Sequence, residues 1–101
     1  NTFDNTLNQT INRDVNTISI QSDGKLIVGG SFMTCSYNYL CRLNTDGTFD
    51  NTFNTGTGFD GSVSTTAIQS DGKILVSGFF NNYNGNSRKY ILRLNTDGSL
   101  D

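Results

Sequence analysis

Short runs of apolar and β-branched residues, separated by turn residues, recur at even intervals along the chain and predict β-strands. In the second half, residues 63–69 and 73–80 form two such runs joined by a tight turn, and residues 90–95 form a third. The first half shows a fourth run complete, at residues 48–53. The pattern therefore predicts units of four antiparallel strands joined by hairpins, with a longer loop between the second and third strands.

The chain contains two copies of one sequence unit. The block IQSDGKLIVGGSF at residues 20–32 returns 48 residues later as IQSDGKILVSGFF at residues 68–80. A period of about 50 residues is typical of propeller blades and similar β arrays. We therefore predict an all-β fold of two four-stranded antiparallel propeller-blade-like repeats, residues 1–47 and 48–101, that form part of a larger propeller or repeat array.

Glycine marks the predicted turns and the predicted close contacts. Asp-Gly supplies the positive φ angles that a two-residue hairpin turn needs. The apolar runs Leu26-Ile27-Val28 and Ile74-Leu75-Val76 predict strands covered on both faces, and Gly29, Gly30 and Gly78 follow them where neighbouring backbone is expected to approach. A sandwich of the two sheets is the alternative to stacked blades. The predicted structural turns lie at Asp23-Gly24, Asp46-Gly47, Asp71-Gly72 and Asp97-Gly98.

Composition narrows the class of protein further. The chain has no Glu, Pro, His or Trp and a single Ala, so a helical bundle is excluded, as are sites that need an imidazole. The seven basic residues are scattered and the net charge is -2, which offers no basic stripe for nucleic acid. No apolar run is long enough to insert into a membrane.

The acidic residues are predicted to be structural. A calcium loop at residues 44–50 fails on spacing, because the first and twelfth ligand positions would fall on Arg42 and Phe53. A group that repeats once per unit is expected to support the fold, so we predict no catalytic residue, no enzyme activity, no metal and no cofactor. The repeated Arg42 and Arg93 are expected to tie blades together through backbone carbonyls or through an Asp such as Asp50.

The loop between the second and third strands is the candidate ligand-binding surface. Flat aromatic rings next to amide groups suit sugar rings, although an Asn-Gly turn with a tyrosine packed over the blade edge explains the same residues. Cys35 and Cys41 either close a small loop or remain a loop thiol and a buried apolar residue. The candidate binding residues are Tyr37 and Tyr39 in the first copy and Tyr83, Asn84, Arg88 and Lys89 in the second.

Two pairs of blocks carry a family resemblance. QSDGKLIVGGSF and QSDGKILVSGFF, with RLNTDGTFDNTFN and its partial echo RLNTDGSLD, resemble the delta-60 repeat, a β-propeller-type repeat of large bacterial surface or secreted proteins. The resemblance covers nearly the whole chain. It implies a blade-like fold and an extracellular, non-catalytic scaffold.

We therefore predict a non-enzymatic structural or interaction module of an extracellular fibre, adhesin or virion appendage, at the cell or virion surface. The alternative is a carbohydrate-binding receptor-recognition module, with a surface glycan as its partner. The chain begins and ends at the same point of the repeat, and two blades do not close a ring. The expected partners are neighbouring copies of the same repeat, from a longer chain or from an oligomer or filament.

Overall fold

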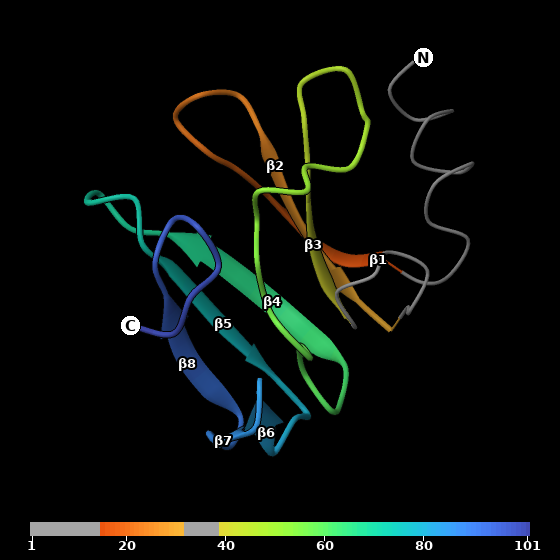
Figure 1. The fold of residues 1–101 in the computed structure, drawn as a ribbon, viewed down its shortest axis with the longest axis vertical. Helices are drawn as coiled ribbons and strands as arrows, with labels where there is room; N and C mark the ends of the chain where they lie inside the picture. Colours follow the sequence, from red (N-terminus) through yellow and green to blue (C-terminus); the bar gives the residue numbers. More distant parts are fainter. Residues whose placement is uncertain (1–14, 32–38) are drawn as a thin grey trace.

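The computed structural model describes residues 15–31 and 39–101, which form two three-stranded antiparallel sheets and one short hairpin (Figure 1). No helix occurs among these residues, and the predicted all-β class is confirmed. Sheet 1 has the order β1 (Val15–Ile20), β2 (Leu26–Gly30), β3 (Leu40–Leu43). Sheet 2 has the order β4 (Val63–Ile68), β5 (Ile74–Gly78), β8 (Ile91–Leu94), and the hairpin β6 (Asn82–Tyr83) and β7 (Asn86–Ser87) lies between β5 and β8 in the chain.

The two sheets share one register, as the sequence repeat predicts. β1 pairs with β2 and β4 pairs with β5 at positions that match one another at the 48-residue offset. Both pairings contain an irregularity at the same point, between Val15 and Thr17 in β1 and between Val63 and Thr65 in β4. Because a slip of one residue would turn every side chain to the other face, the shared register places equivalent residues on equivalent faces.

The fourth strand of each predicted unit is reduced to one antiparallel bridge. These bridges join Leu43 to Phe49 and Leu94 to Leu100. After the first bridge, a side-chain oxygen of Asp50 accepts a hydrogen bond from the backbone N–H of Thr52 at 3.0 Å. This local turn bends the chain away from sheet 1, so the pairing stops where the sequence pattern predicted a full strand.

The Asp-Gly turns differ in type from the predicted two-residue turn. Only the glycine of each pair has a positive φ, which is 89° at Gly24 and at Gly72. The N–H of Gly24 donates to the carbonyl of Gln21 at 2.9 Å, so a type I turn is followed by a left-handed glycine. The aspartate contributes its side chain instead, because Asp23 Oδ1 accepts a hydrogen bond from the N–H of Lys25 at 3.0 Å.

The first strands of the two sheets lie side by side and form the junction. Thr66 Oγ1 lies 3.0 Å from Thr17 Oγ1 and 2.6 Å from Ser19 Oγ. Gly29 faces Val63 across the junction, where an added Cβ would lie 2.6 Å from Val63 Cγ1. The predicted approach of backbone is therefore wrong at Gly29, where the close group is a side chain of the other sheet, and is confirmed at Gly78, where an added Cβ would overlap the carbonyl oxygen of Ser62.

A hydrophobic core fills the space between the sheets. Sheet 1 contributes Ile27 and Leu40. Four aromatic rings complete the core, and the ring centre of Phe59 lies 4.5 Å from that of Phe80 and 4.6 Å from that of Tyr83. The glycine-rich connector between the repeats thus delivers Phe59 to the junction. The remaining core residues are Phe53, Val63, Ile74, Val76, Leu92 and Leu94.

Replacing Gly72 by Val is expected to destabilise the fold by about 1–3 kcal/mol, because a β-branched residue is strained at positive φ. The glycine has a φ of 89°, and its added Cβ would lie 3.0 Å from Thr96 Cγ2. Urea denaturation measures the change. Ser70→Val, an exposed change in the same turn, is the matched control. Equal midpoints for the two variants would contradict the assigned turn.

Candidate functional site

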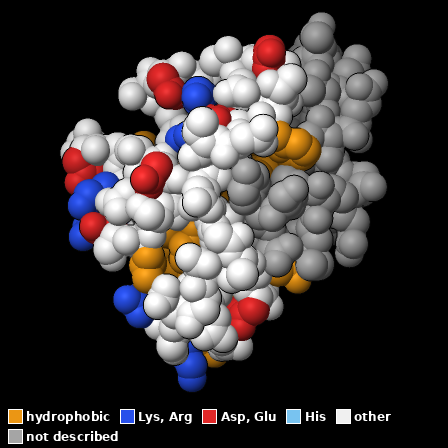
Figure 2. Space-filling model, viewed as in Figure 1, with side chains coloured by type: hydrophobic (Ala, Val, Ile, Leu, Met, Phe, Trp, Pro, Cys, Tyr) orange, Lys and Arg blue, Asp and Glu red, His pale blue; other side chains and the backbone are white. Residues whose placement is uncertain are grey.

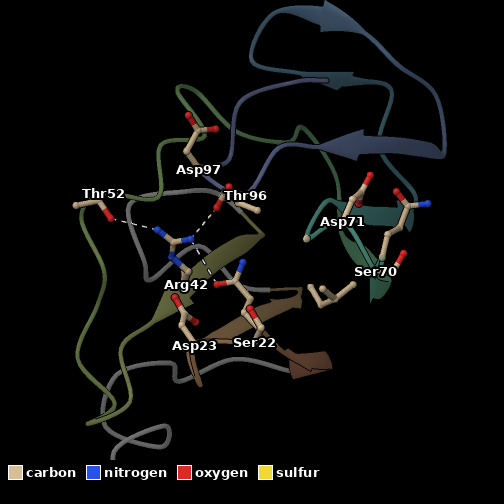
Figure 3. A pocket seen from close by; sticks show the side chains of 12 residues that line it. Ser22, Asp23, Arg42, Thr52, Ser70, Asp71, Thr96 and Asp97 are labelled. Carbon is tan, nitrogen blue, oxygen red and sulfur yellow. Dashed lines mark hydrogen bonds between the residues drawn. The ribbon is translucent and has the colours of Figure 1, made fainter.

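Arg42 on β3 links the two sheets at the edge of the core. Its Nε donates to Asp50 Oδ2 at 2.8 Å, and its Nη1 donates to the carbonyl of Thr96, in the turn after β8, at 2.7 Å. Its Nη2 donates to Thr52 Oγ1 at 3.1 Å (Figure 3). The guanidinium carbon lies 4.9 Å from the ring centre of Phe53. The predicted role of Arg42 in binding a neighbouring carbonyl and Asp50 is confirmed.

The charge of Arg42 is balanced by Asp50, which is itself buried. Lys25 Nζ and Arg42 Nε both lie 2.8 Å from Asp50 Oδ2. Burial by itself raises the pKa of Asp50, but hydrogen bonds from Lys25 and Thr52 and the charge of Arg42 outweigh it and hold the pKa well below its usual range. The carboxylate therefore stays ionised at neutral pH.

The trio Lys25, Arg42 and Asp50 has an equivalent in the second repeat, but that equivalent trio is more exposed. Lys73 Nζ lies 3.1 Å from Asp101 Oδ1, and Arg93 Nε lies 2.5 Å from Asp101 Oδ2. The Arg93 side chain is 48% exposed, whereas that of Arg42 is 10% exposed. The trio becomes a buried junction only where another sheet packs against it.

Tyr83, the first of the predicted sugar-binding residues, lies in the core. It is 1% exposed, and its hydroxyl donates to the carbonyl of Gly98 at 2.5 Å. Burial raises the pKa of this hydroxyl. No face of the ring is open to a ligand, so the alternative of a tyrosine packed over the blade describes Tyr83 correctly.

The other predicted binding residues do not gather at one place. Asn84 and Gly85 form a turn with φ values of 49° and 81°, and Asn84 Oδ1 accepts a hydrogen bond from the N–H of Thr57 at 3.0 Å. Arg88 and Lys89 are exposed, and Tyr39 packs against the core. Tyr37 and Cys35 lie outside the described residues, so the two alternatives for Cys35 and Cys41 stay open, although Cys41 is buried on β3.

A cavity of about 520 Å³ lies beside Arg42, between the turns of the two sheets. Its walls come from the two Gln-Ser-Asp-Gly turns, residues 21–23 and 69–72, and from Thr96 and Asp97. The sequence pattern predicts only a structural role for these turns. The available signal was the identity of the two QSDG blocks, which places the same polar groups in neighbouring blades.

A metal site and a membrane-spanning helix are both absent from residues 15–31 and 39–101. No three His, Cys, Asp or Glu side chains are grouped to hold a metal ion. These residues also contain no helix long and apolar enough to cross a membrane.

Residues 21–53 and 69–101 each match the β-propeller domain of unknown function DUF5122. The matches cover more than half of the chain, which therefore belongs to this family of β-propeller domains. Each match begins at a QSDGK turn, so the family unit follows the repeat. No curated protein and no solved structure matches the chain. The finer resemblance to the delta-60 repeat stays a prediction.

Arg42→Ala is expected to destabilise the protein by about 3–5 kcal/mol, because it leaves the buried Asp50 without its guanidinium partner. Arg93→Ala, the same change in the uncovered trio, is the matched control and should leave the melting temperature nearly unchanged. Calorimetry or thermal circular dichroism compares the two variants. Equal losses would show that Arg42 does not depend on the second sheet.

Stability is expected to fall as the pH drops below about 4, where the unfolded chain binds protons that the folded chain does not bind. The reason is the depressed pKa of Asp50, whose stabilising contribution is complete above the ordinary aspartate pKa and is lost as the pH falls through the lowered value. Below pH 4, the unfolding free energy of Asp50→Asn should depend less steeply on pH than that of the wild type. Asp46→Asn, a change in an exposed turn, should reduce this dependence less. Equal slopes would argue against the buried carboxylate.

Proposed function

We propose that this chain is a non-catalytic structural module of a larger β-propeller or repeat array, whose two open faces bind further copies of the same repeat. The observation that carries the proposal is the internal junction, where one sheet covers the face of another. At the ends of the module, the outer side of sheet 2 is exposed at Ile91, and the outer side of sheet 1 is exposed along β1. Each repeat thus has a docking surface for a neighbour.

The open face of sheet 2 consists of Thr65, Ala67, Leu75, Ser77 and Ile91. These residues line a shallow, apolar hollow of about 210 Å³, and Ile91 is 62% exposed. Figure 2 shows hydrophobic side chains at the surface over β5 and β8. The equivalent residues of sheet 1, which include the fully buried Leu40 in place of Ile91, face sheet 2.

The open face of sheet 1 is limited to β1, at Val15, Ile18 and Ile20, whereas Val28 and Leu26 of β2, which pair with Ile18 and Ile20, are buried. Ile18 is 46% exposed and Ile20 is 69% exposed. Their equivalents in β4 are Val63, Thr66 and Ile68, which belong to the side of sheet 2 that packs on sheet 1. A copy of sheet 1 therefore presents the surface that the open face of sheet 2 would receive.

Residues at the two open faces differ in polarity from their equivalents at the internal junction, and the change on one face corresponds to the change on the other. Inside the module, the hydroxyl of Ser19 meets the hydroxyl of Thr66 at 2.6 Å. At the open faces, Ala67 stands in the place of Ser19 and Ile18 in the place of Thr66. A polar pair is thus replaced by an apolar pair on both sides at once, so the faces suit each other in chemistry as well as in register.

The proposal extends to the setting of the module. The delta-60 resemblance and the Asn- and Thr-rich composition support an extracellular fibre, adhesin or virion appendage. The turn aspartates support a non-catalytic role, since each described Asp-Gly turn uses its carboxylate to hold the backbone two residues ahead. The carbohydrate-binding hypothesis for the Tyr83 loop requires an exposed aromatic ring, and the ring of Tyr83 is buried.

Ile18→Asp and Ile91→Asp test the proposed docking. Each substitution places a carboxylate on one apolar open face and leaves the other face unchanged. Each variant alone should be monomeric in sedimentation velocity, whereas the wild type should associate. A mixture of the two variants should form a one-to-one dimer and nothing larger, since one intact pair of faces remains. Circular dichroism checks that both variants are folded.

A wild-type chain that stays monomeric at about 100 µM, well above the micromolar range of weak assemblies, would overturn the proposal. Association that both charges leave intact would also overturn it. In either case the internal junction would be a property of one two-sheet domain.

A further inference from the structure

We propose that the cavity between the turns of the two sheets binds a neutral sugar ring. This inference is independent of the assembly proposed above, because both walls of the cavity belong to one chain. Figure 3 shows Arg42, Ser22 and Asp23 on one side and Ser70 and Asp71 on the other. The volume of about 520 Å³ falls within the range of about 300–1,000 Å³ that is typical of small-molecule sites.

Hydrogen-bond donors remain available in the cavity wall. Arg42 is 8% exposed, and four of its five N–H groups are engaged, which leaves one on Nη2 without a partner among the described residues. Gln21 is also 8% exposed, and its carbonyl oxygen accepts from Arg42 at 3.4 Å. Its amide NH₂ makes no hydrogen bond within the described part of the chain. These donors can therefore bind an acceptor on a ligand.

Acceptors remain available in the same wall. Asp23 and Asp71 each use Oδ1 to accept a backbone N–H at 3.0 Å, and Asp97 uses Oδ1 to accept from Ser99. Within the described residues, the second carboxylate oxygen of each makes no hydrogen bond. Ser22 and Ser70 add hydroxyls that both donate and accept.

This mixture of groups selects the class of ligand. A simple anion would face the carboxylates of Asp23, Asp71 and Asp97, and a simple cation would face the guanidinium of Arg42. A ring that carries several hydroxyls satisfies both sets, because each hydroxyl can donate to a carboxylate and accept from an amide or guanidinium. Ile68 also lines the cavity and offers an apolar contact for the C–H face of the ring.

The experiment is titration of the isotope-labelled chain, followed by amide NMR shifts, with a panel of neutral hexoses and their methyl glycosides. Inorganic phosphate and spermidine represent the anionic and cationic classes. At least one sugar should give saturable shifts confined to residues 21–24, 69–72 and 96–98. Binding of the methyl glycoside with equal affinity assigns the site to glycan ends, and binding of the free sugar alone assigns it to free hexoses.

Asp71→Asn should weaken this binding about five- to tenfold, because it replaces a charged acceptor while an amide oxygen still supports the turn. Asp46→Asn makes the same change in an equivalent turn outside the cavity, and should leave the affinity unchanged. The absence of saturable shifts with every sugar at about 50 mM would overturn the proposal, since it excludes even millimolar affinity. Equal loss in the two variants, or binding of phosphate or spermidine instead, would overturn it as well.

Discussion

The junction of the two sheets depends on the buried guanidinium of Arg42. A buried charge is tolerated only when its hydrogen-bonding groups have partners, and no single segment of this chain supplies enough of them. Asp50 and Thr52 come from the connector, Gln21 from the first turn of sheet 1, and Thr96 from the last turn of sheet 2. One side chain thus fixes the positions of two turns and the connector, which explains why the sheets meet in one arrangement.

The same residues behave differently in the two repeats, so the junction belongs to neighbouring repeats together. Lys25, Asp50 and Arg42 form a buried cluster, whereas the equivalent cluster at Asp101 remains exposed. Because the second sheet removes water from the buried cluster, each of its charges depends on the others, whereas exposed ion pairs contribute little. Stability in such an architecture comes largely from interfaces between neighbours, as in other repeat proteins.

The paired strands could be predicted from the sequence, because their apolar runs repeat at a constant offset. β2 and β5 lie within the predicted second strands, and the turns fall at the Asp-Gly pairs. The fourth strand could not be predicted correctly, because pairing stops where the Asp50 side chain takes the N–H of Thr52. A packed tyrosine was one of two explanations of Tyr83 that the sequence allowed, but its contact with Phe59 could not be predicted, since a distant connector brings Phe59 against its ring.

A residue that repeats once per unit is expected to have a structural role, but the Asp-Gly turns show that such a residue can also face a cavity. The carboxylates of Asp23, Asp71 and Asp97 each hold a turn with one oxygen, and the other oxygen makes no hydrogen bond within the described residues. Packing one sheet against the next gathers these carboxylates around Arg42 and encloses a cavity. A structural turn and a binding group are therefore compatible in one residue. Because every further junction of the same kind would bring together the same turns, an array would carry one such cavity per junction, and weak binding at each would be reinforced by multivalency.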